Sequence, residues 1–266
     1  MNASAVHDLI GTRSISGVIG EDVKEFFFEV VDTLDKDRFG AENFHSRGFE
    51  GSFVEGAPRI RLLHLEFPWK SSAQSTIRKI SGEREDVIID ILRKSGERFS
   101  CRYDSDFCKN LFTFNEKNGA FPVQLGMECE SSGKPKIKAY LSVNAGEFPL
   151  EKFCLFAGID NADTIRFLKE KRFDTVAVDF LPNGKVAIKF YPLISENKGL
   201  LLRISYDGSM SSKKSWIRFP RGLDIGTVSK SGLFDVPLFL REQGGKHGFK
   251  VHYICLENGK RSIYFR

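Results

Sequence analysis

Charged side chains and tyrosines recur at every second position in stretches whose intervening residues are apolar. The clearest stretch is 174–194. One set of alternating positions there contains Asp179, Lys189 and Tyr191, and the other set contains valine, isoleucine and phenylalanine. Ammonium and guanidinium groups neutralise phosphate oxygens and stabilise the charge that develops as a diphosphate departs. A face of this kind is suited to binding an anion, although a solvent-facing sheet would also account for it.

These positions belong to predicted β-hairpins. Asn183-Gly184 separates the two alternating runs of 174–194, and Asn-Gly in that setting is the strongest short-range signal for a hairpin. Four further hairpins are predicted at 49–67, 123–143, 200–219 and 249–265. Together the five hairpins supply ten strands.

The same alternation, applied to all five hairpins, gathers the candidate binding residues on one side of the strands. The acids, cations and tyrosines of this set are Glu50, Arg61, Lys138, Asp179, Lys189, Tyr191, Arg203, Arg218, Lys250 and Tyr264, and Tyr140, Trp216 and His252 share their side. Aromatic faces among them could surround an allylic carbocation and keep water away from it. In the last hairpin, parity places Tyr253 and Cys255 on the opposite, apolar side.

Segments with helical period separate the hairpins. Residues 21–34 predict an amphipathic helix with the apolar stripe Val23, Phe26, Phe27, Val30, Val31 and Leu34. Residues 69–96 predict one or two helices, with Val87, Ile88, Ile91 and Leu92 on a stripe, and 147–172 predict two short helices with a cap at Asp160-Asn161. Residues 99–114 read as irregular, 195–199 leave hardly any room for a helix, and 223–241 make a poor one.

The predicted fold class is α+β, a ten-stranded antiparallel β-barrel of five hairpins surrounded by helices. Closing a sheet removes its edges, and helices outside would cover the apolar faces and turn the polar faces inward. Side chains fill an eight-stranded barrel, so ten strands leave a cavity. No low-complexity linker interrupts the 266 residues, and a single domain over 1–266 is expected.

Composition narrows the function classes. The chain has 40 basic and 35 acidic residues, and its net charge of +5 suits an anionic ligand without demanding nucleic acid. Five cysteines without paired spacing fit buried thiols in a reducing compartment. Without a signal peptide or an apolar span, a soluble cytoplasmic protein with no membrane or nucleic-acid partner is expected. No phosphate-binding loop, aspartate-rich run or metal-ligand spacing occurs in the sequence.

The strands resemble those of a known family. Helices alternate with hairpins over 49–265, and the segments FEGSFVEG, RIRLLHLEF, KIKAYLSV and VDFLPNGKVAIKFY are similar in order and spacing to ABBA-type prenyltransferases, most of all the cyanobactin peptide prenyltransferases. The resemblance implies the PT barrel, with Glu50 near the acceptor as general base. It also implies that Arg61, Lys138, Lys189 and Tyr191 hold the prenyl diphosphate and that magnesium assists the diphosphate without a dedicated protein site.

The expected function is transfer of an isoprenyl group, most simply dimethylallyl, from its diphosphate to a side chain of a ribosomally made, cyclised peptide. Two alternatives stay open: a small-molecule aromatic prenyltransferase with the same barrel, and a non-catalytic β module whose basic face binds phosphorylated ligands or nucleic acid. Lysines inside a barrel favour an enzyme, whereas lysines on an open surface beside an exposed Trp216 favour the binding module. The acceptor residue, the attacking atom and the donor length also stay open at this point.

Overall fold

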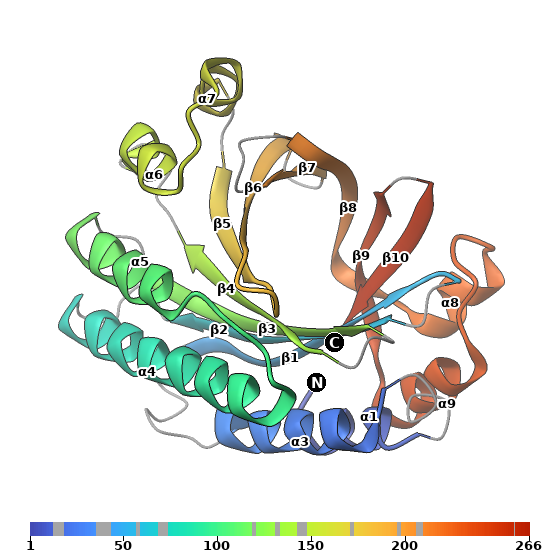
Figure 1. Cartoon of the computed structure of the whole chain (residues 1–266). Coiled ribbons are helices and arrows are strands. Elements are labelled where there is room, and N and C mark those ends of the chain that lie inside the picture. The colour runs from blue at the N-terminus through green and yellow to red at the C-terminus, as the bar shows by residue number, and fades with distance from the viewer. Residues whose placement is uncertain are drawn as a thin grey trace. The chain divides into compact units, whose positions relative to one another are not determined.

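The structure, a computed structural model, describes residues 1–12, 19–35, 44–56, 59–68, 74–118, 121–130, 134–142, 148–170, 173–195, 198–205, 210–257 and 259–266 (Figure 1). Its helices are α1 (Ala3–Ile10), α3 (Glu21–Asp35), α4 (Gln74–Phe99), α5 (Ser105–Asn118), α6 (Leu150–Phe156), α7 (Ala162–Lys169), α8 (Ile225–Lys230) and α9 (Leu238–His247). None of these described helices has the length and apolar character that crossing a membrane requires.

Ten strands accompany the helices. They are β1 (Phe44–Val54), β2 (Arg59–Pro68), β3 (Phe121–Glu130), β4 (Lys136–Ser142), β5 (Phe173–Phe180), β6 (Val186–Ser195), β7 (Lys198–Ser205), β8 (Met210–Asp224), β9 (Lys250–Glu257) and β10 (Lys260–Phe265). Their hydrogen-bonded order is β1-β10-β9-β8-β7-β6-β5-β4-β3-β2, and β1 also pairs with β2. The predicted α+β class built of antiparallel hairpins is confirmed.

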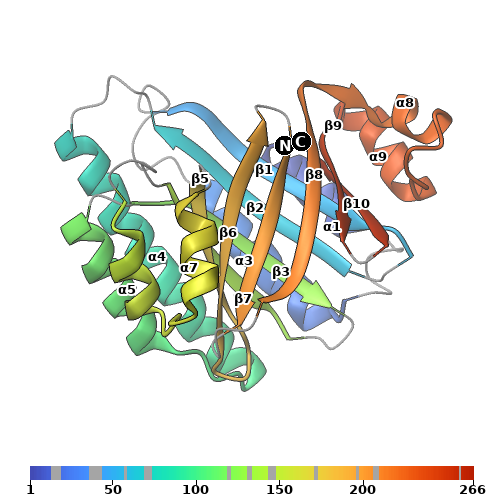
Figure 2. The ribbon, with the colours of Figure 1, turned by 90° about the horizontal axis from the view of Figure 1, so that it is seen from above.

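The chain divides into two compact units. The first comprises 1–72, 126–135 and 216–266, and the second comprises 73–125 and 136–215. In the first unit an antiparallel sheet runs β9-β10-β1-β2. In the second it runs β4-β5-β6-β7, where Figure 2 shows β5, β6 and β7 side by side. The strands β3 and β8 each continue from one unit into the other.

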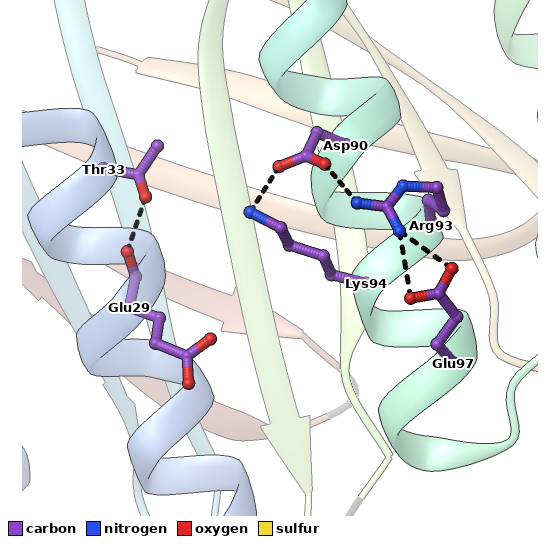
Figure 3. Close-up of polar contacts among 6 residues, drawn as sticks. All are labelled: Glu29, Thr33, Asp90, Arg93, Lys94 and Glu97. Atoms are coloured by element: carbon purple, nitrogen blue, oxygen red, sulfur yellow. Dashed lines mark hydrogen bonds and ion pairs between the residues drawn. The ribbon is translucent and has the colours of Figure 1, made fainter.

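Helix α3 of the first unit forms where acidic residues precede an apolar stripe. Glu21 and Asp22 lie in its first turn, where a negative charge complements the helix dipole. The stripe is buried at all six predicted positions, so the prediction for 21–34 is confirmed. Farther along the helix, the Thr33 hydroxyl donates to the Glu29 carbonyl at 2.7 Å (Figure 3).

Helix α1 ties α3 to α9 in the first unit (Figure 1). His7 Nε2 lies 2.9 Å from Asp32 of α3, and the adjacent Asp8 pairs with Lys246 and His247 of α9. An apolar core joins α1 and α9 to α8 and the sheet through Leu9, Val228, Phe234, Leu240, Phe249, Val251, Ile263 and Phe265. The apolar faces of β9 and β10 are therefore the faces that the helices cover.

The helices of the second unit carry their charges away from the core. Helices α4 and α5 lie side by side (Figures 1 and 2). α4 buries its predicted stripe of Val87, Ile88, Ile91 and Leu92. On the opposite side Arg93 binds Asp90 and Glu97, and Lys94 pairs with Asp90 (Figure 3). The described part of the predicted 69–96 region is one continuous helix.

The prediction that 99–114 is irregular is wrong. Residues 105–114 belong to α5, whose first turn is capped because Asp104 Oδ1 accepts a hydrogen bond from the Phe107 N–H at 2.8 Å. Cys108, Leu111 and Phe112 recur at helical spacing and are buried. Asp104 and the polar residues after it are therefore a helix start rather than an isolated turn.

The hairpin of β5 and β6 forms as the sequence predicts. Val176 lies opposite Phe190, and Ala177 lies opposite Lys189. The turn closes through a hydrogen bond from the Leu181 N–H to the Lys185 carbonyl, and Gly184 has a φ of +83° that favours glycine. The apolar face of the hairpin is buried, and its Phe190 contacts Phe153 of α6. After α6, Asn161 caps helix α7 as predicted.

Four of the five cysteines are buried and form no disulfide among the described residues: Cys101, Cys108, Cys154 and Cys255. Burial raises the pKa of Cys108 to about 12 and that of Cys154 to about 11. These two thiols are therefore protonated and unreactive at neutral pH. The side chain of Cys129 lies outside the described part of the structure.

Candidate functional site

Three lysines surround one aspartate on the polar face of the second unit's sheet. Lys138 of β4 lies directly opposite Asp179 of β5 in the strand register. Lys189 Nζ of β6 donates to Asp179 Oδ2 at 2.5 Å, and Lys136 Nζ lies 4.0 Å from the same oxygen. We call Lys136, Lys138, Asp179 and Lys189 the lysine cluster.

Three of the four residues of the lysine cluster are buried, and Lys136 is half-buried. Asp179 is 0%, Lys138 6% and Lys189 8% exposed. Burial by itself would raise the pKa of Asp179, but the ammonium groups of Lys189, Lys138 and Lys136 outweigh burial and hold that pKa below its usual value. Asp179 is therefore ionised, and three cations around one anion leave the four residues suited to binding an anionic ligand.

Small residues separate the charged ones on this face. The register aligns Tyr140, Ala177, Lys189 and Arg203 in one row across β4 to β7, and Lys138, Asp179, Ala187 and Ser205 in the next. The rings of Tyr140 and Tyr191 lie 6.2 Å apart. Tyrosines and lysines predicted to share a face are thus brought together. The backbone of Arg203 pairs with Lys189, but its side chain lies outside the described residues.

A buried carboxylate stands on the polar face of the first unit. Glu50 of β1 is 4% exposed, and its Oε2 accepts a hydrogen bond from Arg266 Nε at 3.0 Å. Burial raises the pKa of Glu50 above its usual value, and the charge of Arg266 offsets part of that rise. A carboxylate with a raised pKa and a single hydrogen-bonding cation is chemically able to accept a proton.

An aromatic row runs across the same face. The rings of Trp216 and Tyr253 meet edge to face at 5.8 Å, and those of Tyr253 and Tyr264 at 6.3 Å. Ser52 lies opposite Tyr264, and its hydroxyl is buried without a hydrogen-bond partner among the residues that the structure describes. Arg61 lies opposite Ser52 in the register, but the Arg61 side chain is outside the described part of the chain.

The predicted placement of Tyr253 and Cys255 on the apolar side is wrong. Glu257 pairs with Lys260, so the turn between them has two residues and Tyr253 comes to lie opposite Tyr264. A β-bulge at His252 then shifts the register, and Val251 lies opposite Phe265 as parity predicts. The turn length puts Tyr253 on the polar face, and the bulge puts Val251 on the apolar face.

The remaining predicted residues lie at the margin of this face. His252 is half-buried, and burial, followed by the charges of Arg266 and Arg218, lowers its pKa, so it is neutral at pH 7. Arg218 and Lys250 are exposed. Gly222 of β8 lets Lys250 and His252 approach, because a Cβ there would lie 2.7 Å from the Lys250 Cβ. The structure therefore does not bring Arg218 and Lys250 into a buried cluster.

Several residues of these two faces escaped the sequence analysis as site candidates. Lys136 and the buried Lys214 belong to the second unit, and Ser52, Tyr253 and Arg266 belong to the first. Lys136 is two residues before Lys138 in the same strand, so the alternation of the sequence already indicates that both lysines face the same side. Arg266 could be found only by extending the β1–β10 register one step beyond the Gly51–Phe265 pair.

The fold is similar to that of a solved structure. The prenyltransferase PriB, in a ternary complex with L-tryptophan and dimethylallyl thiolodiphosphate, matches with a TM-score of 0.61 over 98% of this chain and 95% of that chain. This chain has the fold of the prenyltransferase PriB. The sequences are 12% identical, so the match with PriB establishes the fold alone. No protein-family model and no curated protein sequence matches the chain.

The described residues do not fit a protein-held metal ion. Among them no group of three or more histidine, cysteine, aspartate or glutamate side chains is placed to bind one. The carboxylate of the lysine cluster is already paired with Lys189 Nζ.

Proposed function

We propose that this protein is a prenyltransferase that transfers an isoprenyl group, most simply dimethylallyl, from its diphosphate to a nucleophilic acceptor. The observation that carries the proposal is the buried lysine cluster in a chain with the fold of PriB. Buried lysines also favour an enzyme over a surface module for phosphorylated ligands or nucleic acid. A protein that binds the phosphates of a large molecule such as nucleic acid needs its lysines and arginines exposed on its own surface.

The lysine cluster supplies the chemistry at the donor. Ammonium groups of Lys136, Lys138 and Lys189 neutralise the diphosphate oxygens and stabilise the charge that develops as the carbon–oxygen bond breaks. Tyr140 and Tyr191 present aromatic faces beside the same lysines, where they stabilise a carbocation and exclude water. Magnesium, held by the diphosphate, is proposed to assist this neutralisation.

Glu50 supplies the chemistry at the acceptor. The acceptor atom bonds to the allylic carbon, inorganic pyrophosphate leaves with the electron pair of the broken bond, and the acceptor's proton passes to Glu50. A buried carboxylate is suited to this role because its raised pKa brings it closer to the pH at which it must accept a proton.

The acceptor that we propose is a side chain of a ribosomally made, cyclised peptide, as in the family that the strands resemble. A small aromatic acceptor is the second candidate, favoured by the L-tryptophan bound to PriB. We further propose that 1–266 is one barrel domain. The closed strand order and the continuity of β3 and β8 from one unit to the other support that proposal.

A transfer assay tests the function. Purified protein is incubated with dimethylallyl or geranyl diphosphate, magnesium, and either cyclic peptides or tryptophan, and mass spectrometry detects an added prenyl group. Lys138→Met is the informative variant because it removes one cation and leaves the Lys189–Asp179 pair intact. We expect Lys138→Met to weaken donor binding about tenfold or more, since hydrogen bonds to charged groups contribute about 1.5–3 kcal/mol.

Lys185→Met is the matched control, because Lys185 is an exposed residue of the turn in the same β5–β6 hairpin. It should leave transfer and donor binding unchanged. If the unmodified protein prenylates neither peptide nor tryptophan and calorimetry detects no binding of inorganic pyrophosphate, the proposed function is wrong.

A further inference from the structure

Glu50 is an acid in surroundings that would favour its neutral form. Its side chain is 4% exposed, and a carboxylate buried without a partner takes up a proton in preference to remaining charged. A general base must be ionised before the acceptor arrives. The role assigned to Glu50 under the proposed function therefore needs a group that keeps it charged.

Arg266 stands where such a group is required. Gly51 pairs with Phe265 across β1 and β10, so the next register step sets Arg266 opposite Glu50. Reciprocal backbone hydrogen bonds with Lys250, at 2.9 and 3.0 Å, hold Arg266 in the ladder. Gly51 leaves room for the Phe265 ring, because a Cβ there would lie 2.6 Å from that ring.

The contact between the two side chains is single and directional. Arg266 Nε donates to Glu50 Oε2 at 3.0 Å, while Oε1 accepts no hydrogen bond from any residue that the structure describes. One oxygen is thus held by the guanidinium and the other is left to meet a ligand.

The other charged groups near Glu50 contribute less at neutral pH. The Met1 amine donates to the Phe49 carbonyl at 2.7 Å, and burial, then Arg266, lowers its pKa to about 6. His252 of β9 also has a lowered pKa and is neutral at pH 7. Lys250 is exposed and contacts Arg266 through its backbone, and Tyr264 and Ser52 lie on the same face without charge. The β2 side chains opposite Glu50 are outside the described residues.

We propose that Arg266 is a positioning residue for the general base: it keeps the Glu50 carboxylate ionised inside the sheet and occupies Oε2, so that Oε1 receives the acceptor's proton. This inference rests on the proposed function for its catalytic meaning. During transfer the acceptor–hydrogen bond breaks, the hydrogen leaves as a proton to Oε1, and Arg266 stays protonated throughout, so no further reactant is needed.

The test compares Arg266→Gln, which removes the charge, with Arg266→Lys, which keeps a cation. Carbon-13 NMR of glutamate-labelled protein, with Glu50→Gln to assign the signal, follows the titration of Glu50 directly. We expect the Glu50 pKa to rise by about one unit or more in Arg266→Gln, and by less in Arg266→Lys, since an opposite charge within about 4–6 Å shifts a carboxyl by about one to three units. The acid limb of the pH–rate profile should move upward by the same amount.

Arg241→Gln, an exposed change on α9, is the control for loss of an arginine and should move neither quantity. Thermal melting of each variant verifies that it is folded. An unchanged Glu50 titration in folded Arg266→Gln overturns the proposal, as does a uniform loss of rate with an unshifted acid limb. A protein that transfers no prenyl group would instead refute the proposed function, while the titration still decides whether Arg266 controls the charge of Glu50.

Discussion

At the scale of single residues, Asp179 and Lys189 form a buried ion pair whose members depend on each other. Their contact is 2.5 Å long, and Asp179 has no exposed surface. Removing one partner of such a pair leaves a buried charge uncompensated, whereas replacing both by apolar side chains can be nearly neutral. The pair is therefore more informative when both residues are changed than when one is.

Lys189→Met should lower the free energy of unfolding at pH 7 by about 3–5 kcal/mol. The double change Lys189→Met with Asp179→Leu removes one charge of each sign and should recover part of that loss, because Asp179 no longer lacks its hydrogen-bonding cation, while Lys138 and Lys136 lose the carboxylate beside them. Urea unfolding measures both, with the exposed Lys185→Met as control. A double variant as unstable as the single one would show that leaving Lys136 and Lys138 without a carboxylate costs as much stability as leaving Asp179 without Lys189.

The pH dependence of stability follows from the same residue. The lysines depress the pKa of Asp179 in the folded state, so its contribution is fully present above the usual value of 3.8 and is lost as the pH falls below it. The free energy of unfolding should therefore change less between pH 6 and pH 3 in the double variant than in the unmodified protein. An equal difference in both would mean that other carboxylates govern the acid transition.

The alternation of residue types predicts most of the lysine cluster and only part of the first unit's polar face. In the β5–β6 hairpin the register preserves parity, so Asp179 and Lys189 fall together as expected. In β9 and β10 a two-residue turn and a bulge at His252 each shift the pairing by one residue, and Tyr253 changes side. The two-residue turn alone moves Tyr253 and Cys255 to the polar face, and the Asn-Gly pair was a signal for it, whereas the bulge that returns Val251 to the apolar face has no signature in the alternation of residue types.

At the scale of elements, helix α5 shows how a polar cluster can be interpreted in two ways. Asp104, Ser105 and Asp106 resemble a turn, yet Asp104 caps the helix by accepting from the Phe107 N–H. The buried positions Cys108, Leu111 and Phe112 already had helical spacing in the sequence, so the signal was present but was outweighed by the local turn composition.

Replacing the cap tests this interpretation of α5. Asp104→Ala should lower the free energy of unfolding by about 1 kcal/mol, since an N–H of the first turn loses its acceptor. Asp104→Asn keeps an acceptor oxygen and should change stability far less. Urea midpoints of the two variants give the comparison, and equal losses in both would indicate that the charge of Asp104, not its hydrogen bond, stabilises the helix.

Adjacent glycines in α9 make a second matched pair at this scale. A Cβ at Gly245 would meet nothing within 4 Å, whereas one at Gly244 would lie 3.0 Å from Ile225 of α8. Alanine favours a helix interior over glycine by about 1 kcal/mol. Gly245→Ala should therefore raise the urea midpoint, and Gly244→Ala should gain less or lose stability because Ile225 must shift. Equal gains at both positions would contradict the close packing of α8 on α9.

At the scale of the whole molecule, the hydrogen-bonded strand order is the feature that the sequence predicts best. Consecutive hairpins pair in chain order, and the short 195–199 connection lets β6 pair directly with β7. The division into two compact units could not be predicted, because no linker marks it and the continuous strands β3 and β8 each belong to both units.

The proposed function makes different demands on the two units, and ligand binding can separate them. A ligand that binds only the folded state stabilises it by about 2.7 kcal/mol at a concentration of one hundred times Kd. Inorganic pyrophosphate should therefore raise the free energy of unfolding of the unmodified protein and do so much less in Lys138→Met, which lacks a cation of the lysine cluster. Glu50→Gln should retain the full effect, because Glu50 belongs to the first unit and is assigned to the acceptor. Calorimetry and urea unfolding with and without pyrophosphate make the comparison. If Glu50→Gln abolished the stabilisation and Lys138→Met preserved it, the diphosphate would have to be assigned to the first unit instead.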